Sequence, residues 1–423
     1  MLIEFSVKNF KSIRERQTLS MVASKYYKEF IDENTFEVDS EEKFPRLLKS
    51  AVIYGPNASG KTSLVDAMTF VDWMVGHSAK ESRLEDGVSV IPFRLSYESR
   101  SSDSEFEVNF FEEGVRYEFG FTANSERITS EWLYAYPSGK MQRWYKREYV
   151  AESDQDSYVW SKLFKGGRRR TDWRLNTRSN SLFLSAAIQL NNEQLRPVYN
   201  WFTKRLATMD PANLTASYTM ERFDDAKKDI LSFLSGADLF ISDIRIERRK
   251  FDPSEVPNDM PSAFRDEFIK TMSGREIAEP KFYLDSIDGS GPVEFDDDEI
   301  SAGTKALFKF SGPWLDVMRN KRVLLVDELD SSLHPLVVHQ LIESLNSKGT
   351  QAQVIFTTHD TSILGQNILR RDQVWMIDKD EYQSSVLTPL SDYSVREDEA
   401  LEKGYLAGRY GGIPFVKDFS NGN

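Results

Sequence analysis

Short apolar runs near both ends of the chain predict the strands of its main sheet. Residues 2–10 alternate loosely between apolar and polar side chains, which is typical of a half-buried strand. Residues 51–55 (AVIYG) form an apolar run typical of a fully buried strand. Residues 62–75 carry many apolar side chains and no Gly or Pro, which predicts a largely buried helix. Residues 51–75 are therefore expected to fold as a strand, a glycine-containing loop and a helix.

The same alternation of apolar runs and helical segments returns late in the chain. Residues 322–328 (RVLLVDE) and 353–359 (QVIFTTH) predict two buried strands, with a helix between them at about 336–345. Short buried strands that alternate with helices are typical of a parallel sheet covered on both faces. Because one such strand lies near residue 52 and the others beyond residue 322, we expect one sheet assembled from both ends of the chain.

The middle of the chain has different patterns. Three β-rich runs, at 106–111, 117–121 and 132–136, are separated by turn residues, which predicts antiparallel hairpins. Beyond residue 150 the pattern is mixed. Helices are expected there at 194–206, 223–234 and 263–272.

These patterns predict an α/β fold with a mixed or parallel sheet, an antiparallel β lobe and a helical insertion. A length of 423 residues would allow about three domains at ~150 residues each. The separated strands instead favour one discontinuous head, residues 1–150 and 291–423. Residues 151–290 are expected to form an inserted, mainly helical lobe.

The composition narrows the chemistry that is open to the chain. No cysteine and only four histidines occur, which excludes disulfide scaffolds, thiolate zinc sites, iron–sulfur clusters and cysteine nucleophiles. No apolar run approaches the ~20 residues of a membrane span, and the first residues lack a signal-peptide pattern. A cytoplasmic location without a membrane partner is therefore expected. The formal net charge of −13 argues against a general nucleic-acid coat protein, because phosphate attraction needs clustered Lys and Arg.

Residues 55–62 (GPNASGKT) fit the pattern G-x-x-x-x-G-K-[ST] between a predicted strand and a predicted helix. In that context backbone N–H groups turn toward phosphates, and the helix N-terminus favours negative charge. Lys61 would reach the β- and γ-phosphates of a nucleotide, and Thr62 would offer its hydroxyl to Mg²⁺. The alternative, a chance glycine loop before a helix, explains the four fixed positions less well. The expected nucleotide-binding residues here are Asn57, Ala58, Ser59, Gly60, Lys61, Thr62 and Ser63.

Asp327 and Glu328 follow directly after the apolar run 323–326. Buried parallel strands end at the sheet edge where ligands bind. We therefore expect Asp327 to hold Mg²⁺ and Glu328 to polarise a water for attack on the γ-phosphate. On its own, an apolar strand followed by two acids is as often structural. His359 ends the next predicted strand at the same edge, which suits a γ-phosphate sensor, although a lone histidine is more often a structural hydrogen-bonding group.

Ser301 and Gly303 lie within residues 300–305 (ISAGTK), just before a helical pattern at 306–318. A hydroxyl and free N–H groups at a helix start form a second arrangement that favours anions. In isolation, an ordinary helix N-cap followed by a flexible glycine is the simpler explanation.

Taken together, these motifs resemble those of the ABC-type ATPase heads of the SMC, RecF and OLD group. GPNASGKT resembles their Walker A motif, SAGTK their signature, VLLVDE their Walker B motif, residues 331–335 (SSLHP) their D-loop and TTHD their H-loop. The order along the chain also matches, as does the opening NFKSI at 9–13. Residues 371–380 and 404–416 are similar to RloA/AbiL-type ATPases, a cluster that includes the ATPase subunit of the PARIS defence system.

This resemblance implies ATP and Mg²⁺ as cofactors and an ATP sandwich. In such a sandwich Ser301 and Gly303 of one copy would contact the γ-phosphate bound at Lys61 of another, so that hydrolysis, expected to be slow, requires a homodimer or a larger homo-oligomer. Gln189 stands here for the family's Mg²⁺-sensing glutamine, although many surface glutamines would look the same. The expected catalytic residues are Lys61, Glu328 and His359, and the expected metal ligands are Thr62, Asp327 and Gln189.

The chain departs from these relatives in several ways. Ala302 and Thr304 stand where many relatives have Gly and Glu. Long heptad arms are absent, so a chromosome-tethering coiled coil is not expected. Too few residues follow His359 for the TOPRIM domain that OLD nucleases append, and we interpret Asp378 and Asp380 as solvated acids at the end of a strand.

The most basic stretch of the chain lies between residues 162 and 178. Its Lys and Arg side chains are interleaved with Trp160, Phe164 and Trp173, a pattern that fits base stacking and phosphate contact. A solvated hairpin around residues 166–167, or a surface that docks an acidic protein, explains the pattern at least as well. The basic residues are Lys162, Lys165, Arg168, Arg169, Arg170, Arg174 and Arg178.

The sequence therefore predicts an ATP-driven switch or sensor that controls a separately encoded effector. The resemblance implies prokaryotic antiviral defence by abortive infection, with a TOPRIM-fold nuclease as candidate effector and a phage protein as candidate trigger. Two alternatives stay open. One is a DNA-binding repair ATPase similar to RecF, and the other is that the chain is itself a nuclease or toxin.

Overall fold

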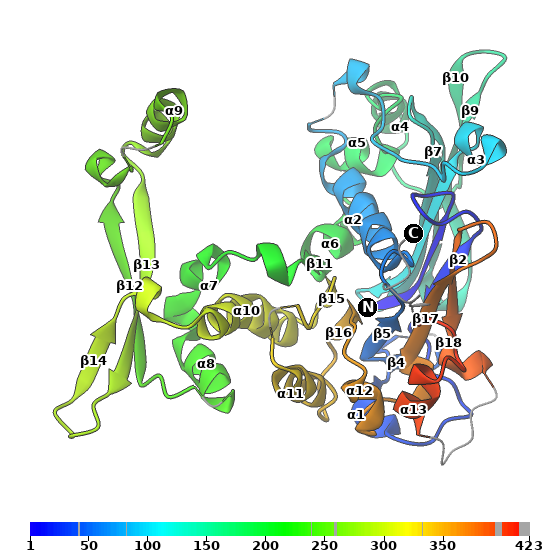
Figure 1. The fold of residues 1–423 in the computed structure, drawn as a ribbon. Coiled ribbons are helices and arrows are strands. Elements are labelled where there is room, and N and C mark those ends of the chain that lie inside the picture. The colour runs from blue at the N-terminus through cyan, green and yellow to red at the C-terminus, as the bar shows by residue number, and fades with distance from the viewer. Residues whose placement is uncertain are drawn as a thin grey trace, which may run out of the picture. The chain divides into compact units, whose positions relative to one another are not determined.

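The central sheet of the computed structural model has six strands, of which five come from the two ends of the chain and one, β11 (Leu206–Met209), from its middle (Figure 1). Strand β5 (Ser50–Tyr54) lies between β16 (Gln353–Thr357) and β17 (Val374–Lys379) and pairs with both in parallel. Every residue of β5 and β16 is buried, as expected for strands covered on both faces. The prediction of one sheet built from both ends of the chain is confirmed. The full order is β11, β15 (Val323–Val326), β16, β5, β17 and the antiparallel β18 (Ser385–Pro389).

Helices connect these strands at the predicted places. Helix α2 (Lys61–His77) follows β5 after a short loop, and α11 (Pro335–Leu345) connects β15 to β16. Leu64, Met68 and Val71 recur at helical spacing on the buried side of α2. They belong to a hydrophobic cluster that also contains residues of the central sheet and of the β lobe described next. The helix that begins at the glycine-containing loop thus packs against both the central sheet and the β lobe.

The β lobe is a seven-stranded antiparallel sheet. Its strands β6 (Ser104–Glu112), β7 (Val115–Ala123) and β8 (Ile128–Tyr136) are the predicted hairpins. The opening strand β1 (Leu2–Lys8) pairs with β6, so the start of the chain completes this sheet. The expected α/β class, with a mixed sheet and an antiparallel β lobe, is confirmed. The strand order is β10 (Gln155–Trp160), β9 (Gln142–Val150), β8, β7, β6, β1 and β2 (Gln17–Ser20).

A pair of stacked aromatic rings joins the β lobe to the segment that leads into β11. The helix expected at 194–206 is shorter in the structure: α6 (Arg196–Asn200) passes into a π-helical turn at Trp201–Arg205. This turn places the Trp201 ring against Phe110 of β6, with centroids 4.2 Å apart, and both side chains are fully buried. Offset stacking of this kind stabilises beyond simple area burial.

The chain divides into two compact units, Met1–Asp210 with Val317–Asn423, and Pro211–Asp316. The predicted insertion began at residue 151, whereas the second unit begins sixty residues later by this division. The physical reason is strand pairing, since β10 pairs with β9 and β11 pairs with β15, all within the first unit. The predicted insertion also ended earlier, at residue 290.

The second unit combines helices with a small antiparallel sheet. Strands β12 (Asp243–Lys250), β13 (Glu276–Asp285) and β14 (Pro292–Phe295) are rich in charged side chains, and so the apolar alternation that reveals strands in a sequence is weak there. Phe282 of β13 packs against Phe308, with centroids 5.5 Å apart. The helices expected at 223–234 and 263–272 are confirmed. The helices are α7 (Ser217–Glu221), α8 (Phe223–Gly236), α9 (Ser262–Met272) and α10 (Ala302–Arg319), whose last residues enter the first unit.

The structure describes residues 1–40, 43–81, 83–237, 239–257, 260–331, 333–393 and 400–413. Within these ranges, none of the helices has the length and apolar character needed to cross a membrane. The shorter elements of the first unit are α1 (Ile31–Asn34), β3 (Thr35–Phe36), β4 (Leu47–Leu48), α3 (Tyr97–Ser101), α4 (Arg169–Leu175), α5 (Phe183–Gln189), α12 (Ser362–Gly365) and α13 (Leu401–Leu406).

Removal of the Trp201 ring should destabilise the first unit strongly. Trp201→Ala deletes a fully buried aromatic side chain, a change that typically costs about 3–5 kcal/mol. Trp73→Ala is the matched control, because the Trp73 side chain is 37% exposed. Thermal unfolding followed by circular dichroism should show a clear loss of Tm for Trp201→Ala and a small change for Trp73→Ala. Equal shifts for the two variants would contradict the packing described here.

Candidate functional site

The loop between β5 and α2 turns sharply at two residues with left-handed backbone conformation. Ala58 has φ +63° and Gly60 has φ +113°, the latter in a region that residues with a side chain rarely adopt. A Cβ atom on Gly60 would also lie 2.1 Å from Ser385 Oγ and 2.6 Å from Ser12 Oγ. Gly60 is therefore required both by the backbone conformation and by the close approach of two other segments.

Lys61, the first residue of α2, has a buried side chain that is 6% exposed. Its Nζ donates to the carbonyl oxygens of Gly55 (2.7 Å) and Pro56 (3.2 Å), and within the described ranges it forms no ion pair. Burial lowers the pKa of Lys61, while the negative charges of Glu328 and Asp327 raise it. A buried amine that bonds only to carbonyl oxygens lacks a counter-ion, and a phosphate would provide one.

The predicted nucleotide-binding residues of the loop differ in their exposure. Asn57, Ala58 and Thr62 are exposed, so the Thr62 hydroxyl is accessible to a ligand. Ser59 is buried, and its Oγ has no hydrogen-bond partner among the residues that the structure describes. An orphaned buried hydroxyl beside a buried amine fits a loop that accommodates a polar ligand.

Two serines from distant parts of the chain brace this loop. Ser385 Oγ, at the start of β18, donates to the Ser59 carbonyl oxygen (2.6 Å). Ser12 Oγ donates to Ser63 Oγ (2.8 Å) and shares a hydrogen bond of 2.8 Å with Ser385 Oγ. Sequence analysis did not assign either serine. Ser12 lies in the quoted NFKSI motif, which could have drawn attention to it, whereas nothing local distinguishes Ser385.

Asp327 and Glu328 lie directly after β15, at the C-terminal edge of the central sheet. Thr357, which ends β16, connects them: its Oγ1 donates to Asp327 Oδ1 (2.6 Å) and accepts from the Glu328 backbone N–H (2.7 Å). Thr357 is fully buried, whereas the Glu328 side chain is exposed and its φ is +54°. Because β15, β16 and β5 are parallel neighbours, the two carboxylates and the loop after β5 lie at the same edge of the sheet. The negative charges of both carboxylates raise the pKa of Lys61, against the effect of its burial. Thr357 is a site residue that sequence analysis missed, although it belongs to the TTHD motif.

His359 follows β16 at the same edge, and its side chain is exposed. Its backbone N–H donates to Asp330 Oδ2 (3.3 Å), while Asp330 Oδ1 is buried and has no partner in the described part of the chain. Asp330 also acts electrostatically on Lys61. The loops after β15 and β16 are thus joined near the predicted phosphate position. In the predicted D-loop, residue 332 lies outside the described residues.

Gln189 lies elsewhere, which corrects its assignment as a metal ligand. It ends α5, and its side chain is exposed. Helix α5 packs on the C-terminal end of α2, where Ser185 Oγ donates to the Met74 (3.2 Å) and Val75 (2.7 Å) carbonyl oxygens. Thr62 lies at the other end of α2, roughly 20 Å away along the helix axis at 1.5 Å per residue. The structure therefore does not bring Gln189 to Thr62.

Ser301 and Gly303 belong to the second unit and lie at the start of α10. Ser301 Oγ accepts from the Thr304 backbone N–H (3.2 Å) and shares a hydrogen bond with Thr304 Oγ1 (2.8 Å), as an N-cap serine does. A Cβ atom on Gly303 would meet no other atom within 4 Å, so this helix start is open. The predicted contact of these residues with a nucleotide of another copy stays a prediction.

The aromatic residues of the basic stretch are part of the hydrophobic core. Phe164 is fully buried and Trp173 is 4% exposed, and the Trp160 ring stacks on Phe164 with centroids 5.5 Å apart. These rings are not free to stack on bases. The structure does not favour the interpretation of the stretch as a base-stacking surface, because Phe164 and Trp173 are buried. Five of its seven basic side chains are exposed, whereas Arg170 and Arg178 are half-buried.

The site fits a nucleoside triphosphate with Mg²⁺. Among the residues that the structure describes, no group of three or more His, Asp and Glu side chains could hold a metal ion. Mg²⁺ commonly takes one or two protein oxygens together with phosphate oxygens and waters. Thr62 Oγ1, at the start of α2, and Asp327, directly after β15, are the oxygens expected from the sequence, and both follow strands that end at the same edge of the sheet.

Comparisons with known proteins agree with this geometry at the level of the family. A family model described as "AAA domain, putative AbiEii toxin, Type IV TA system" matches residues 50–365, about three quarters of the chain. Comparison with curated proteins gives no match.

Among solved structures, the chain is similar to the SMC head domain from Thermotoga maritima and to an SMC head bound to the C-terminal winged-helix domain of ScpA. The first is 14% identical with a TM-score of 0.40, covering 92% of this chain and 98% of that chain. The second is 13% identical with a TM-score of 0.42, covering 92% and 96%. Values this low assign no function. The family model, by contrast, spans both the glycine-containing loop and the carboxylate strand, and the chain belongs to this AAA-domain family.

Proposed function

We propose that the chain is an ATP-binding and ATP-hydrolysing switch of a prokaryotic antiviral defence system, where it controls a separately encoded effector. The observation that carries the proposal is the buried Lys61 amine, which forms no ion pair with any described residue and follows a loop at the same sheet edge as Asp327 and Glu328. The triphosphate of ATP supplies the missing negative charge. The family description, which names a type IV toxin–antitoxin system, supports the defence role.

Each residue of the site has a distinct task in this proposal. Lys61 and the N–H groups at the start of α2 hold the β- and γ-phosphates. Thr62 and Asp327 would hold Mg²⁺, which neutralises phosphate charge when bound. Glu328 accepts the proton of the attacking water, and its exposed side chain leaves room for that water. His359, at the neighbouring strand end, contacts the γ-phosphate as a sensor.

The switch also requires a second copy of the chain. Ser301 and Gly303 form an open helix start that offers a hydroxyl and N–H groups to an anion. In the proposed ATP sandwich they complete the site of the other copy, so that slow hydrolysis reports on dimerisation. The partner in turn is an effector such as a TOPRIM-fold nuclease, as the resemblance to RloA/AbiL and PARIS-type ATPases implies. A phage protein is the proposed trigger.

The alternative function, a DNA-binding repair ATPase similar to RecF, has less support than a role in antiviral defence. Its sequence basis was an aromatic surface for bases, and Phe164 and Trp173 are buried. The family description instead keeps open that the chain is itself the toxic component. Purified wild-type chain that degrades no nucleic acid in the presence of Mg²⁺ and ATP would exclude a nuclease activity of its own.

Substitution of the two central residues should separate ATP binding from hydrolysis. Lys61→Ala should weaken ATP binding by about 10- to 100-fold, because a charge-assisted contact is lost. Glu328→Gln should keep ATP binding and lower kcat by about 100-fold or more, because the general base is removed. Equilibrium binding of a fluorescent ATP analogue and release of inorganic phosphate measure the two effects.

Glu381→Gln serves as the control for the charge change, because Glu381 is exposed in the turn before β18. It should leave both measurements unchanged. A Glu328→Gln protein that hydrolyses ATP at the wild-type rate would remove Glu328 as the base.

Loss of the Thr357 hydroxyl should affect catalysis more than binding. Thr357→Val keeps the shape of the side chain but removes the donor to Asp327 Oδ1 and the acceptor for the Glu328 N–H. We expect kcat to fall by about tenfold, since each lost buried hydrogen bond costs about 1–3 kcal/mol. Thr357→Ser should restore activity. Thr358→Val is the matched control, since the Thr358 hydroxyl accepts from the Asp360 N–H instead. Equal losses in the two valine variants would contradict a specific role for Thr357.

A further inference from the structure

The segment 162–175 presents basic side chains without acidic partners. Five of its Lys and Arg side chains are exposed, and within the described part of the chain none of them forms an ion pair. This is unusual in a protein with a net charge of −13, where acids outnumber bases. The segment contains one acid, the exposed Asp172, but its basic side chains outnumber that acid, and such an excess creates a local field that attracts negative charge. The five residues are Lys162, Lys165, Arg168, Arg169 and Arg174.

The segment is held rigidly on the β lobe. The Trp173 ring of α4 lies edge to face with Phe164, with centroids 6.0 Å apart. Gly166 has φ +129°, and a Cβ atom there would lie 2.5 Å from the Trp173 ring, so the loop closes directly on the indole. Gln194 fixes the loop further, with Oε1 accepting from the Lys165 backbone N–H (2.7 Å). The cost of ordering the segment on binding a partner is therefore small.

Exposed leucines distinguish between the two kinds of anionic partner. Leu163 is 53% exposed and Leu175 is 71% exposed, at the two ends of the same segment. A nucleic-acid backbone gives such side chains nothing to pack against, and the aromatic rings that could stack on bases are buried. Protein interfaces, in contrast, combine arginines with apolar side chains. We propose that residues 162–175 form a docking surface for an acidic partner protein that also carries apolar side chains.

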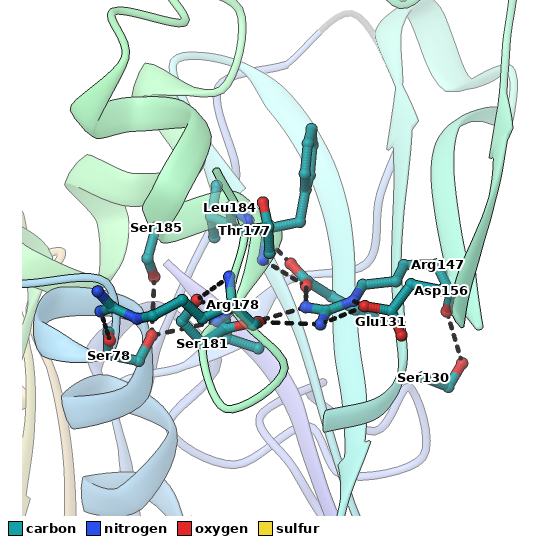
Figure 2. A network of polar contacts seen from close by, with 12 residues as sticks. Ser78, Ser130, Glu131, Arg147, Asp156, Thr177, Arg178, Ser181, Leu184 and Ser185 are labelled. Carbon is teal, nitrogen blue, oxygen red and sulfur yellow. Dashed lines mark hydrogen bonds and ion pairs between the residues drawn. The ribbon is translucent and has the colours of Figure 1, made fainter. Parts of the chain in front are cut away.

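A network of polar contacts joins the loop that follows this segment to the C-terminal end of α2 (Figure 2). Just after the segment, Arg178 Nη2 donates to the carbonyl oxygens of Ser78 (3.2 Å) and Ala79 (2.9 Å), directly beyond the C-terminus of α2. A cation at that position is favoured by the helix dipole. Arg147 of β9 holds the same loop through the carbonyl oxygens of Arg178 (3.1 Å) and Ser181 (2.7 Å).

The network continues into the β lobe through a buried carboxylate. Glu131 of β8 is fully buried and accepts from the backbone N–H groups of Phe183 (2.6 Å) and Leu184 (2.9 Å), at the start of α5. Arg147 also pairs with Asp156 of β10 at 2.7 Å. Most polar atoms of this network are paired, although Arg178 Nε is buried without a partner among the described residues, and the paired contacts hold the loop between α4 and α5 in place. A partner on residues 162–175 thus acts on one end of α2, while Lys61 lies at the other end.

This proposal deepens the proposed function, because it identifies the surface on which the switch would bind its partner. It rests on the proposed function only in assuming that a partner exists. The test uses the full chain and two probes of defined chemistry: a random glutamate–tyrosine copolymer and a short duplex DNA. The triple variant Arg168→Glu/Arg169→Glu/Arg174→Glu should bind the copolymer at least about tenfold more weakly than wild type, near physiological ionic strength.

Two controls make the test specific. The triple variant Arg94→Glu/Lys140→Glu/Arg143→Glu changes the net charge equally at exposed positions outside the segment, and should retain copolymer binding. The double variant Leu163→Ser/Leu175→Ser should weaken binding of the copolymer but not of pure polyglutamate, because only the copolymer offers apolar side chains.

Several outcomes would overturn the proposal. These are tighter patch-dependent binding of the duplex than of the copolymer, equal losses in the two triple variants, and no copolymer binding by wild type. Lys61→Ala separates this proposal from the proposed function, since it should lose ATP binding and keep copolymer binding. If the segment variant fails to bind while its ATP hydrolysis is normal, the switch site itself is intact.

Discussion

The structure of the site depends on one uncompensated charge. Lys61 is buried at the start of α2, and its ammonium group is satisfied by two carbonyl oxygens of its own loop rather than by a carboxylate. Burial of an unpaired cation is costly, and such a group is retained where an anionic ligand provides the missing partner. Asp327 and Glu328 lie at the same edge of the sheet as the loop before Lys61, so the arrangement suits an anion that binds together with a divalent cation.

The rest of the first unit holds this charge in position. Gly60 permits the turn that starts α2. Ser12, in the turn between β1 and β2, and Ser385, at the start of β18, contact the loop and the first turn of the helix. Thr357 holds the backbone and side chain of the carboxylate pair. These contacts come from segments hundreds of residues apart in the sequence, which explains why the sheet is assembled from both ends of the chain.

The sequence predicted well those features that are local and periodic. The loop at 55–62, the carboxylates at 327–328 and the strands that carry them have apolar runs and a fixed motif spacing. Ser385 and Thr357 were missed because their roles arise only from tertiary contact. Gln189 was misplaced because a motif read in one dimension does not reveal on which end of α2 its helix packs. Strands such as β12 were missed because their charged residues carry little apolar alternation.

The burial of aromatic side chains also changed the interpretation of the basic stretch. Interleaving of Trp and Arg in a sequence is compatible with two opposite arrangements, and only burial distinguishes them. Trp173 packs inward, so the exposed basic side chains and leucines form the proposed docking surface for a protein. The polar network through Arg178 and Arg147 connects the loop after that surface to α2. Nucleotide and partner would then act on the two ends of one helix.

The central claim is that Lys61 binds the phosphates of a nucleotide. Isothermal titration of the full chain with Mg²⁺–ATP and with adenosine tests it most directly, because the two ligands share the base and ribose and differ in the phosphates. The account predicts that ATP binds at least about 100-fold more tightly than adenosine, since charge-assisted contacts to phosphate are worth several kcal/mol together. Equal affinities for the two ligands, or no binding of ATP, would contradict it.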